Sequence, residues 1–136
     1  MKTYKLNDLN NPLISVLMPA YNAEKYIKEA IESILNQTFS NFEFIIIDDG
    51  SIDATEEIIK SFKDSRIVYI KNEKNLGLIK TLNKGISIAR GEFIARMDSD
   101  DISMPQRFEL QLDVFKKYKG VDIVNVALKK NVRRWN

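Results

Sequence analysis

The chain has 136 residues, enough for one domain with a hydrophobic core and too few for two comfortable ones. Its formal net charge of +2 gives no strong field for nucleic acid or an anionic membrane, and no apolar run reaches the roughly 18 residues that span a bilayer. The lack of cysteine excludes disulfides and thiolate metal sites, and the lack of histidine excludes imidazole catalysis and ligation.

The first predicted strand follows a polar leader at residues 1–12. Residues 13–18 form an apolar run that ends at Pro19, the pattern of a buried strand, because proline cannot donate to a sheet ladder. Asn22 then fits a helix N-cap, since an apolar stripe at helical spacing begins five residues later, at Ile27. The start of the chain therefore predicts a strand followed by a helix.

The middle of the chain repeats this alternation twice. Residues 42–47 form a second apolar strand, which ends in the polar sequence Asp-Asp-Gly-Ser at residues 48–51. A helix with its apolar face around residues 58–62 leads to a third strand at residues 67–70. Apolar residues then recur at helical spacing over residues 78–89, which predicts another helix.

The last third predicts two more strands around one helix. Residues 93–97 form a short apolar strand that runs directly into an acidic turn at residues 98–101. Phe108, Leu112 and Phe115 mark the inner face of the next helix, residues 122–128 are a fifth strand candidate, and residues 129–136 are a basic tail. Residues 13–128 thus form one domain between the leader and the tail.

This order of strands and helices predicts the fold class. Strands that are apolar on both faces and joined by helices indicate an α/β, doubly wound, mostly parallel sheet with helices on both faces. Ligands bind to such sheets beyond the carboxyl ends of the strands. Polar clusters follow the first, second and fourth strands, at residues 19–22, 48–51 and 98–101, so we expect one site along that edge.

Asp98 and Asp100 directly follow the fourth strand. In extended geometry, side chains at i and i+2 point the same way, so these two carboxylates repel each other unless a cation or hydrogen-bond donors lie between them. Hard divalent cations such as Mg²⁺ or Mn²⁺ bind such oxygen pairs, often together with substrate phosphates. A polar turn before the next helix is the alternative, and Asp101 and Ser103 fit a helix start better than a site.

A nucleoside diphosphate laid along this edge could find further partners. Asp49 could accept a hydrogen bond from a pyrimidine N–H, Tyr21 could offer its ring to the base, and Lys80 could neutralise phosphate. Each has an ordinary alternative: an Asx turn for Asp49, packing at the core rim for Tyr21 and a solvated helix surface for Lys80. Asp98 could reach a ribose hydroxyl or the cation.

A series of short segments occurs in a fixed order over residues 13–126. They are Ile-Ser-Val-Leu-Met-Pro-Ala-Tyr-Asn (14–22), Ser-Ile-Leu-Asn-Gln-Thr (33–38), Phe-Ile-Ile-Ile-Asp-Asp-Gly-Ser-Ile-Asp (44–53), Asn-Leu-Gly (75–77), Asn-Lys-Gly (83–85), Ala-Arg-Gly-Glu-Phe-Ile (89–94) and Asp-Ser-Asp-Asp (98–101), with Pro105 and Arg107 downstream. Together they resemble the nucleotide-binding half of family 2 glycosyltransferases.

The resemblance implies a GT-A fold, which is Rossmann-like, and transfer of a sugar from a nucleotide-diphosphate sugar, most often a UDP-sugar, to an acceptor hydroxyl with inversion. It implies that Pro19, Ala20 and Tyr21 line the base pocket, that Asp49 binds the base and that Asp98 belongs to the element that holds the ribose. With Lys80 and Ser99 added, the predicted nucleotide-binding set is Pro19, Ala20, Tyr21, Asp49, Lys80, Asp98 and Ser99. It also implies that Asp98 and Asp100 hold Mg²⁺ or Mn²⁺. The acceptor would be a carbohydrate or a lipid-linked carbohydrate in polysaccharide biosynthesis, and the location cytoplasmic, at or near the membrane surface.

The end of the chain departs from the family pattern. Family members continue well beyond this point and supply the acceptor site and a catalytic base there, whereas residues 129–136 contain no carboxylate, so no catalytic residue can be assigned. We therefore expect a fold that is incomplete at its C-terminal end. A non-catalytic nucleotide-binding or assembly module is the alternative function, and an open sheet edge at residues 122–128 would favour a homo-oligomer.

Other doubly wound domains fit the sequence less well. A dinucleotide-binding fold needs a glycine-rich turn after the first strand, and residues 19–24 contain no glycine. A Walker phosphate-binding loop is also absent from the sequence. Response-regulator receivers carry their acidic residues after the first and third strands, rather than after the second and fourth.

Overall fold

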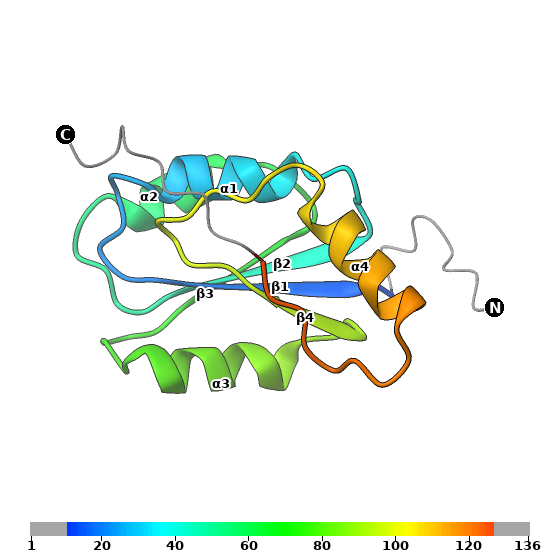
Figure 1. Cartoon of the computed structure of the whole chain (residues 1–136). Coiled ribbons are helices and arrows are strands. Elements are labelled where there is room, and N and C mark those ends of the chain that lie inside the picture. Colours follow the sequence, from blue (N-terminus) through cyan, green and yellow to red (C-terminus); the bar gives the residue numbers. More distant parts are fainter. Residues whose placement is uncertain (1–10, 127–136) are drawn as a thin grey trace.

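The computed structural model describes residues 11–126, in which strands and helices alternate along the chain (Figure 1). The elements are β1 (Ile14–Ala20), α1 (Ile27–Leu35), β2 (Phe42–Asp48), α2 (Thr55–Ser61), β3 (Ile67–Lys71), α3 (Leu78–Ile88), β4 (Phe93–Arg96) and α4 (Arg107–Lys117). This alternation confirms the predicted α/β class. The leader up to residue 10 and the basic tail lie outside the described residues.

The four strands form one parallel sheet in the order β3-β2-β1-β4. Ile14, at the start of β1, is in register with Phe42 on one side and with Phe93 on the other. The chain moves outward from β1 to β2 and β3 and then returns to the opposite side of β1 to form β4. The carboxyl ends of β1 and β4 therefore frame the switch point at which doubly wound sheets bind ligands.

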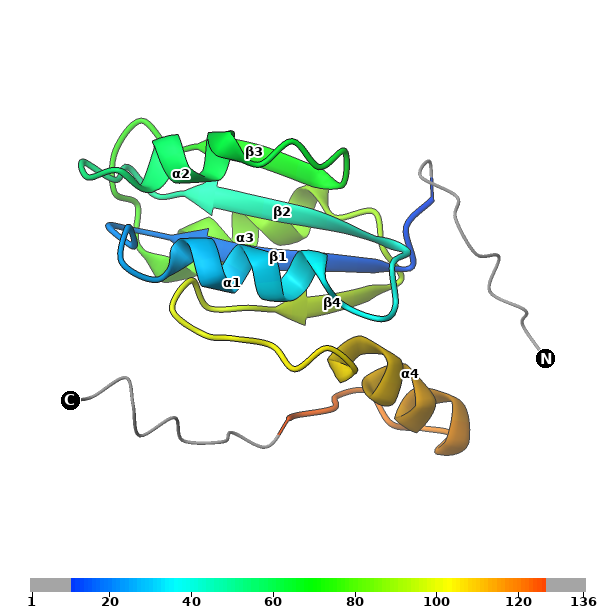
Figure 2. The ribbon, with the colours of Figure 1, turned by 90° about the horizontal axis from the view of Figure 1, so that it is seen from above.

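Helices cover both faces of this sheet, as predicted: α1 and α2 lie on one face and α3 on the other (Figures 1 and 2). The central strands β1 and β2 are buried almost throughout, which explains why their sequences are apolar without alternation. The side chains of Val16, Phe44 and Ile46 join the larger core under α1, and those of Leu17 and Ile45 form a smaller cluster on the α3 face. Among residues 11–126, no helix is long and apolar enough to cross a membrane.

The prediction that β1 ends before Pro19 is wrong, because the strand continues to Ala20. The backbone of Leu17 forms its hydrogen bonds on the side of β4, because its carbonyl accepts the N–H of Met97 at 2.9 Å. Strand β4 itself ends at Arg96. Pro19 lies two residues beyond Leu17 and faces the same side, where no strand remains beside it. The N–H that proline lacks is therefore not needed by any ladder.

Asn22 does not cap α1, which begins at Ile27. Its backbone instead has a φ of 47°, in the left-handed region that asparagine tolerates better than most residues. Its side-chain oxygen accepts the N–H of Ile52 at 3.0 Å. The residue therefore joins two loops rather than starting a helix.

The predicted fifth strand is also wrong for the part of it that the structure describes. Residues 122–126 have no strand structure, and residues 127 and 128 lie outside the described range. The Gln111 side chain of α4 donates to the carbonyl of Val124 at 3.1 Å, and Ile123 is 79% exposed. This backbone thus bonds to a helix side chain, so the sheet edge from which we predicted self-association does not form in the described residues.

Gly91 allows the chain to pass tightly over the start of β1. Its N–H donates to the Ser15 hydroxyl at 2.8 Å, and a Cβ at this position would lie 2.5 Å from the Ser15 nitrogen and 2.7 Å from the Ile14 carbonyl carbon. Backbone atoms cannot move aside as a flexible side chain can. Glycine is therefore required here for close approach.

Gly91→Ala should lower the free energy of unfolding by about 1–3 kcal/mol or more, because overpacking against backbone cannot relax. Gly85→Ala in α3 is the matched control, since the side-chain ends of Ile47 and Leu17 lie 3.2 Å from its Cβ position and alanine favours a helix by about 0.8–1 kcal/mol. Urea unfolding of both variants tests this. Equal losses in the two would contradict the close-approach explanation.

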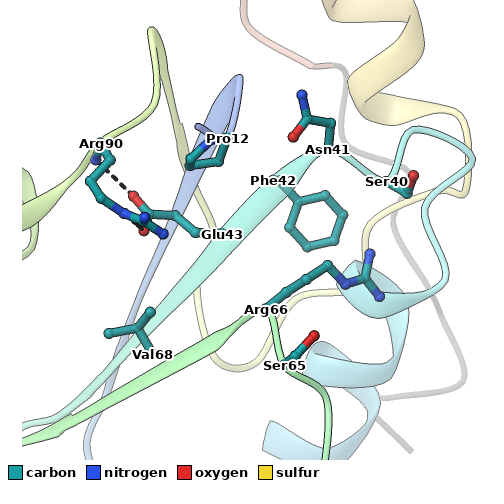
Figure 3. Close-up of a pocket in the computed structure, with 9 residues that line it drawn as sticks. All are labelled: Pro12, Ser40, Asn41, Phe42, Glu43, Ser65, Arg66, Val68 and Arg90. Atoms are coloured by element: carbon teal, nitrogen blue, oxygen red, sulfur yellow. Dashed lines mark hydrogen bonds and ion pairs between the residues drawn. The ribbon is translucent and has the colours of Figure 1, made fainter. Parts of the chain in front are cut away.

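The buried carboxylate of Glu43 holds the amino ends of the strands together (Figure 3). One of its oxygens accepts the Ser15 hydroxyl at 2.6 Å and the Arg90 N–H at 2.7 Å, and the other accepts the Arg90 guanidinium at 3.0 Å. Burial raises the pKa of Glu43, but the hydrogen bonds from Ser15 and Arg90 outweigh it and hold the pKa below its usual range. The charged form therefore stabilises the fold.

Because the pKa of Glu43 is lower in the folded chain, its contribution to stability is present above pH 4.5, the ordinary value, and is lost as the pH falls below it. Glu43→Gln should cost about 1–3 kcal/mol at pH 7. The difference between wild type and variant should shrink steadily below pH 4.5. Unfolding curves measured from pH 7 to pH 3 test this, and a difference that stays constant with pH would contradict it.

Candidate functional site

A hollow of about 530 Å³ lies at the carboxyl edge of the sheet, where the loops that follow β1, β2, β3 and β4 meet. Its lining consists of Pro19, Ala20, Tyr21, Asn22, Ala23, Tyr26, Asp49, Asn75, Gly77, Leu78, Arg96, Asp98, Ser99 and Asp100. This is the edge on which the sequence placed the site. A second, smaller hollow of about 90 Å³ lies at the opposite edge (Figure 3), where Glu43 is paired with Arg90.

The larger hollow brings together six of the seven predicted nucleotide-binding residues and both predicted metal ligands. The six are Pro19, Ala20, Tyr21, Asp49, Asp98 and Ser99. Tyr21 is 51% exposed, so its ring faces the hollow and solvent more than the core. Lys80 is different, because it is exposed on α3 and is not among the lining residues.

Asp49 is the most constrained side chain of the hollow. Its Oδ1 accepts the Leu76 N–H at 2.8 Å and the Asn72 amide at 2.9 Å, and its Oδ2 accepts the Gly77 N–H at 3.0 Å. Burial raises the pKa of Asp49, but the hydrogen bonds from Leu76, Asn72, Gly77 and Thr81 outweigh it and lower the pKa. The carboxylate is therefore charged and fixes the loop that begins α3.

Asn72 donates a hydrogen bond to Asp49 and is itself held by two further residues. It is buried, and its amide nitrogen also contacts the Thr81 hydroxyl at 3.2 Å, while its oxygen accepts from the Lys84 ammonium at 2.8 Å. This assignment of the amide leaves each polar atom of Asn72 with a partner. Sequence reasoning gave Asn72 no role, because its partners lie 9 to 23 residues away and become neighbours only in the folded chain.

The loop that carries Tyr21 is tied to the loop after β2 by hydrogen bonds in both directions. The bonds run from the N–H groups of Asn22, Ala23 and Glu24 to the side chains of Ser51, Thr55 and Asp53, and from the N–H groups of Ile52 and Ala54 to the side chains of Asn22 and Glu24. Each loop thus satisfies backbone donors of the other. The two loops form one rigid wall of the hollow.

The acidic turn forms a second wall of the hollow. Carboxylate oxygens of Asp98, Asp100 and Asp101 all lie within 4.8 Å of one another. Three hard oxygen donors at such spacing fit Mg²⁺ or Mn²⁺. Asp101, which the sequence favoured as a helix start, thus lies in one cluster with the two carboxylates expected to bind a metal.

Arg107, the first residue of α4, clamps this turn to β4. Its guanidinium donates to the Arg96 carbonyl at 2.9 Å and to the Ser103 hydroxyl at 3.0 Å, so it bridges the two ends of the turn. Burial lowers the pKa of Arg107, although the nearby charge of Asp101 opposes that change. The sequence signal for this role is an arginine at the start of the helix that follows an acidic turn.

Comparison with known proteins places this architecture. A sequence model of Glycosyl transferase family 2 matches residues 15–136. An uncharacterized glycosyltransferase of Methanocaldococcus jannaschii is 46% identical over 123 residues, which are 88% of this chain and 42% of that protein. The Escherichia coli UDP-Glc:alpha-D-GlcNAc-diphosphoundecaprenol beta-1,3-glucosyltransferase WfgD is 37% identical over 123 residues, 86% of this chain and 49% of WfgD.

Among solved structures, Staphylococcus aureus TarS residues 1–349 in complex with UDP superposes with a TM-score of 0.72 at 30% identity, over 85% of this chain and 38% of that 1–349 chain. The same region of TarS in complex with UDP-GlcNAc also gives a TM-score of 0.72. The fold thus defines a GT-A domain of the glycosyltransferase class. The chain belongs to glycosyltransferase family 2 and spans less than half the length of the two relatives named above.

Asp49→Asn should lower the free energy of unfolding by about 1–3 kcal/mol, because an amide nitrogen in place of one oxygen leaves a buried donor without an acceptor. Asp122→Asn, at an exposed position outside the hollow, is the control and should change stability little. Thermal or urea unfolding of the two variants at pH 7 tests this. If both variants unfold like wild type, Asp49 does not organise the loop.

Proposed function

We propose that the chain is the donor-binding part of a metal-dependent, inverting glycosyltransferase that takes a UDP-sugar as donor. The observation that carries this proposal is that Tyr21, Asp49 and the acidic turn, which follow three different strands, line a single hollow. An aromatic ring, a fixed carboxylate and a set of cation ligands are the partners that a base, a pyrimidine N–H and a diphosphate require.

In this proposal the rigid wall holds the nucleoside. Tyr21 stacks on the base, Pro19 and Ala20 line the base pocket beside it, and Asp49 accepts an N–H of the base. Because Asp49 is already held by the loop at Leu76 and Gly77, it can receive the base without rearranging. Lys80 has the weakest support of the set, since it is exposed on α3 and outside the lining.

The acidic wall holds the diphosphate end of the donor. Asp98 and Asp100, joined by Asp101, would ligate Mg²⁺ or Mn²⁺, with Ser99 beside the ribose and phosphates. Such a cation, when bound, offsets the charge that develops on the departing nucleoside diphosphate. The acceptor hydroxyl would attack the anomeric carbon from the opposite face, which gives inversion.

The names of the relatives support the donor and acceptor classes. WfgD is named for transfer from UDP-Glc to a diphosphoundecaprenol-linked GlcNAc, and TarS was solved with UDP and with UDP-GlcNAc. We therefore propose a UDP-sugar donor and a carbohydrate or lipid-linked acceptor in polysaccharide biosynthesis. A lipid-linked acceptor would place the reaction at the cytoplasmic surface of a membrane.

Calorimetric titration with UDP, with and without Mn²⁺, tests donor binding. Wild type should bind UDP at least about tenfold more tightly with Mn²⁺, a difference of about 1.4 kcal/mol. Asp100→Asn should lose this dependence on Mn²⁺ with its unfolding curve unchanged, because the side chain is exposed. Asp122→Asn should behave like wild type in both titrations.

Two outcomes would count against the proposal. Absence of UDP binding by wild type under every condition would contradict donor recognition. Full dependence on Mn²⁺ in Asp100→Asn would leave donor recognition standing and show that the acidic turn is not the cation site.

A further inference from the structure

Among residues 11–126, Arg96 is the only basic residue that lines the larger hollow, which also contains the carboxylates of Asp49, Asp98 and Asp100. Like charges confined in one hollow repel an anionic ligand. The diphosphate in the proposed function is such a ligand, so it needs positive partners. Arg96 is the one that the described lining supplies.

The guanidinium of Arg96 is held only loosely. Its Nε and Nη2 both lie 3.3 Å from Oδ1 of Asp98, longer than the roughly 2.7–2.9 Å of a strong charge-assisted hydrogen bond. The two side chains are 54% and 47% exposed. Exposed ion pairs of this kind contribute about 0–1 kcal/mol, so little is lost when the pair separates.

The backbone of Arg96, in contrast, is fixed on both sides. It is in register with Leu17 of β1, and its carbonyl accepts from Arg107 at 2.9 Å. The next residue, Met97, is buried and donates its N–H to the Leu17 carbonyl. The Arg96 side chain can therefore exchange Asp98 for another partner while its Cα stays fixed at the rim of the hollow and the acidic turn does not move.

We propose that Arg96 is a diphosphate-binding residue, and that Asp98 pairs with its guanidinium as long as no cation is bound. Both nitrogens of Arg96 contact the same oxygen of Asp98, Oδ1, so a cation that is ligated by Oδ1 competes with the guanidinium and frees it. A free guanidinium at this rim can form two parallel hydrogen bonds to phosphate oxygens. This inference rests on the proposed function and adds to it a phosphate ligand and an order of events.

Two titrations of Arg96→Gln test the two parts of this inference separately: the pairing of Arg96 with Asp98 in the absence of a cation, and the binding of phosphate by Arg96. Titrated with Mn²⁺ alone, the variant should bind up to about fivefold more tightly than wild type, because no ion pair has to be broken. Titrated with UDP at saturating Mn²⁺, it should bind about tenfold more weakly, because the phosphate ligand is gone. Opposite signs are expected if Arg96 exchanges partners, and the charge-conserving Arg96→Lys variant separates such an exchange from the loss of a positive charge.

Two further variants control for charge and for folding. Arg96→Lys should recover part of the UDP affinity, since it keeps the charge but not the paired geometry. Arg90→Gln removes an arginine that is 51% exposed and paired with Glu43 at the opposite edge of the sheet, and it should change neither titration. Circular dichroism of each variant establishes that it is folded before the titrations.

The contrary outcomes are distinct from one another. Weaker binding of both Mn²⁺ and UDP by Arg96→Gln would show that Arg96 only supports the turn, and unchanged UDP binding would show that it does not contact phosphate; either result overturns the inference. Wild type that binds no UDP with Mn²⁺ would overturn the proposed function and this inference with it. Wild type that binds while Arg96→Gln binds equally well overturns this inference alone.

Discussion

The site depends on one buried charge, the carboxylate of Asp49. It follows β2, yet it accepts hydrogen bonds from Asn72 after β3 and from the backbone of Leu76 and Gly77 before α3. A neutral side chain could not accept all of these donors, so the charge shapes the loop as well as facing the hollow. In the proposed function, binding and folding therefore depend on the same group, beside which the rest of the rim is built.

Most of the fold follows from local sequence, and the errors come from tertiary context. The four strands and the helices between them were predicted because buried parallel strands are continuous apolar runs. The predicted end of β1 before Pro19 was wrong, because β4 has already ended beside Pro19 and no neighbouring strand needs the N–H that proline lacks. The fifth strand was wrongly predicted because an apolar run does not show whether a neighbouring strand is available to pair with it. The carbonyl of Val124 accepts a hydrogen bond from a side chain of α4 instead.

The site divides in the same way. Asp49, Asp98 and Asp100 were expected to lie together because aspartates that follow parallel strands gather at one edge, and all three line the hollow. Asn72 was not found, because its partners lie far away in the sequence. Arg96 is only two residues from Asp98, but the sequence does not show that it lines the hollow. Arg107 was noted as part of the family resemblance, without the contacts that it makes in the folded chain. Lys80 was proposed for its charge alone, and the direction of a helical side chain depends on how α3 lies against the sheet.

The two walls of the hollow are attached to the sheet independently. Asn22 and its neighbours are hydrogen-bonded to the loop after β2, whereas Arg107 links the acidic turn to β4. Substitutions on one wall can thus accumulate without disturbing the other. Under the proposed function, such modular construction would let descendants of one ancestral domain change the nucleobase that they recognise while conserving the diphosphate site, or the reverse.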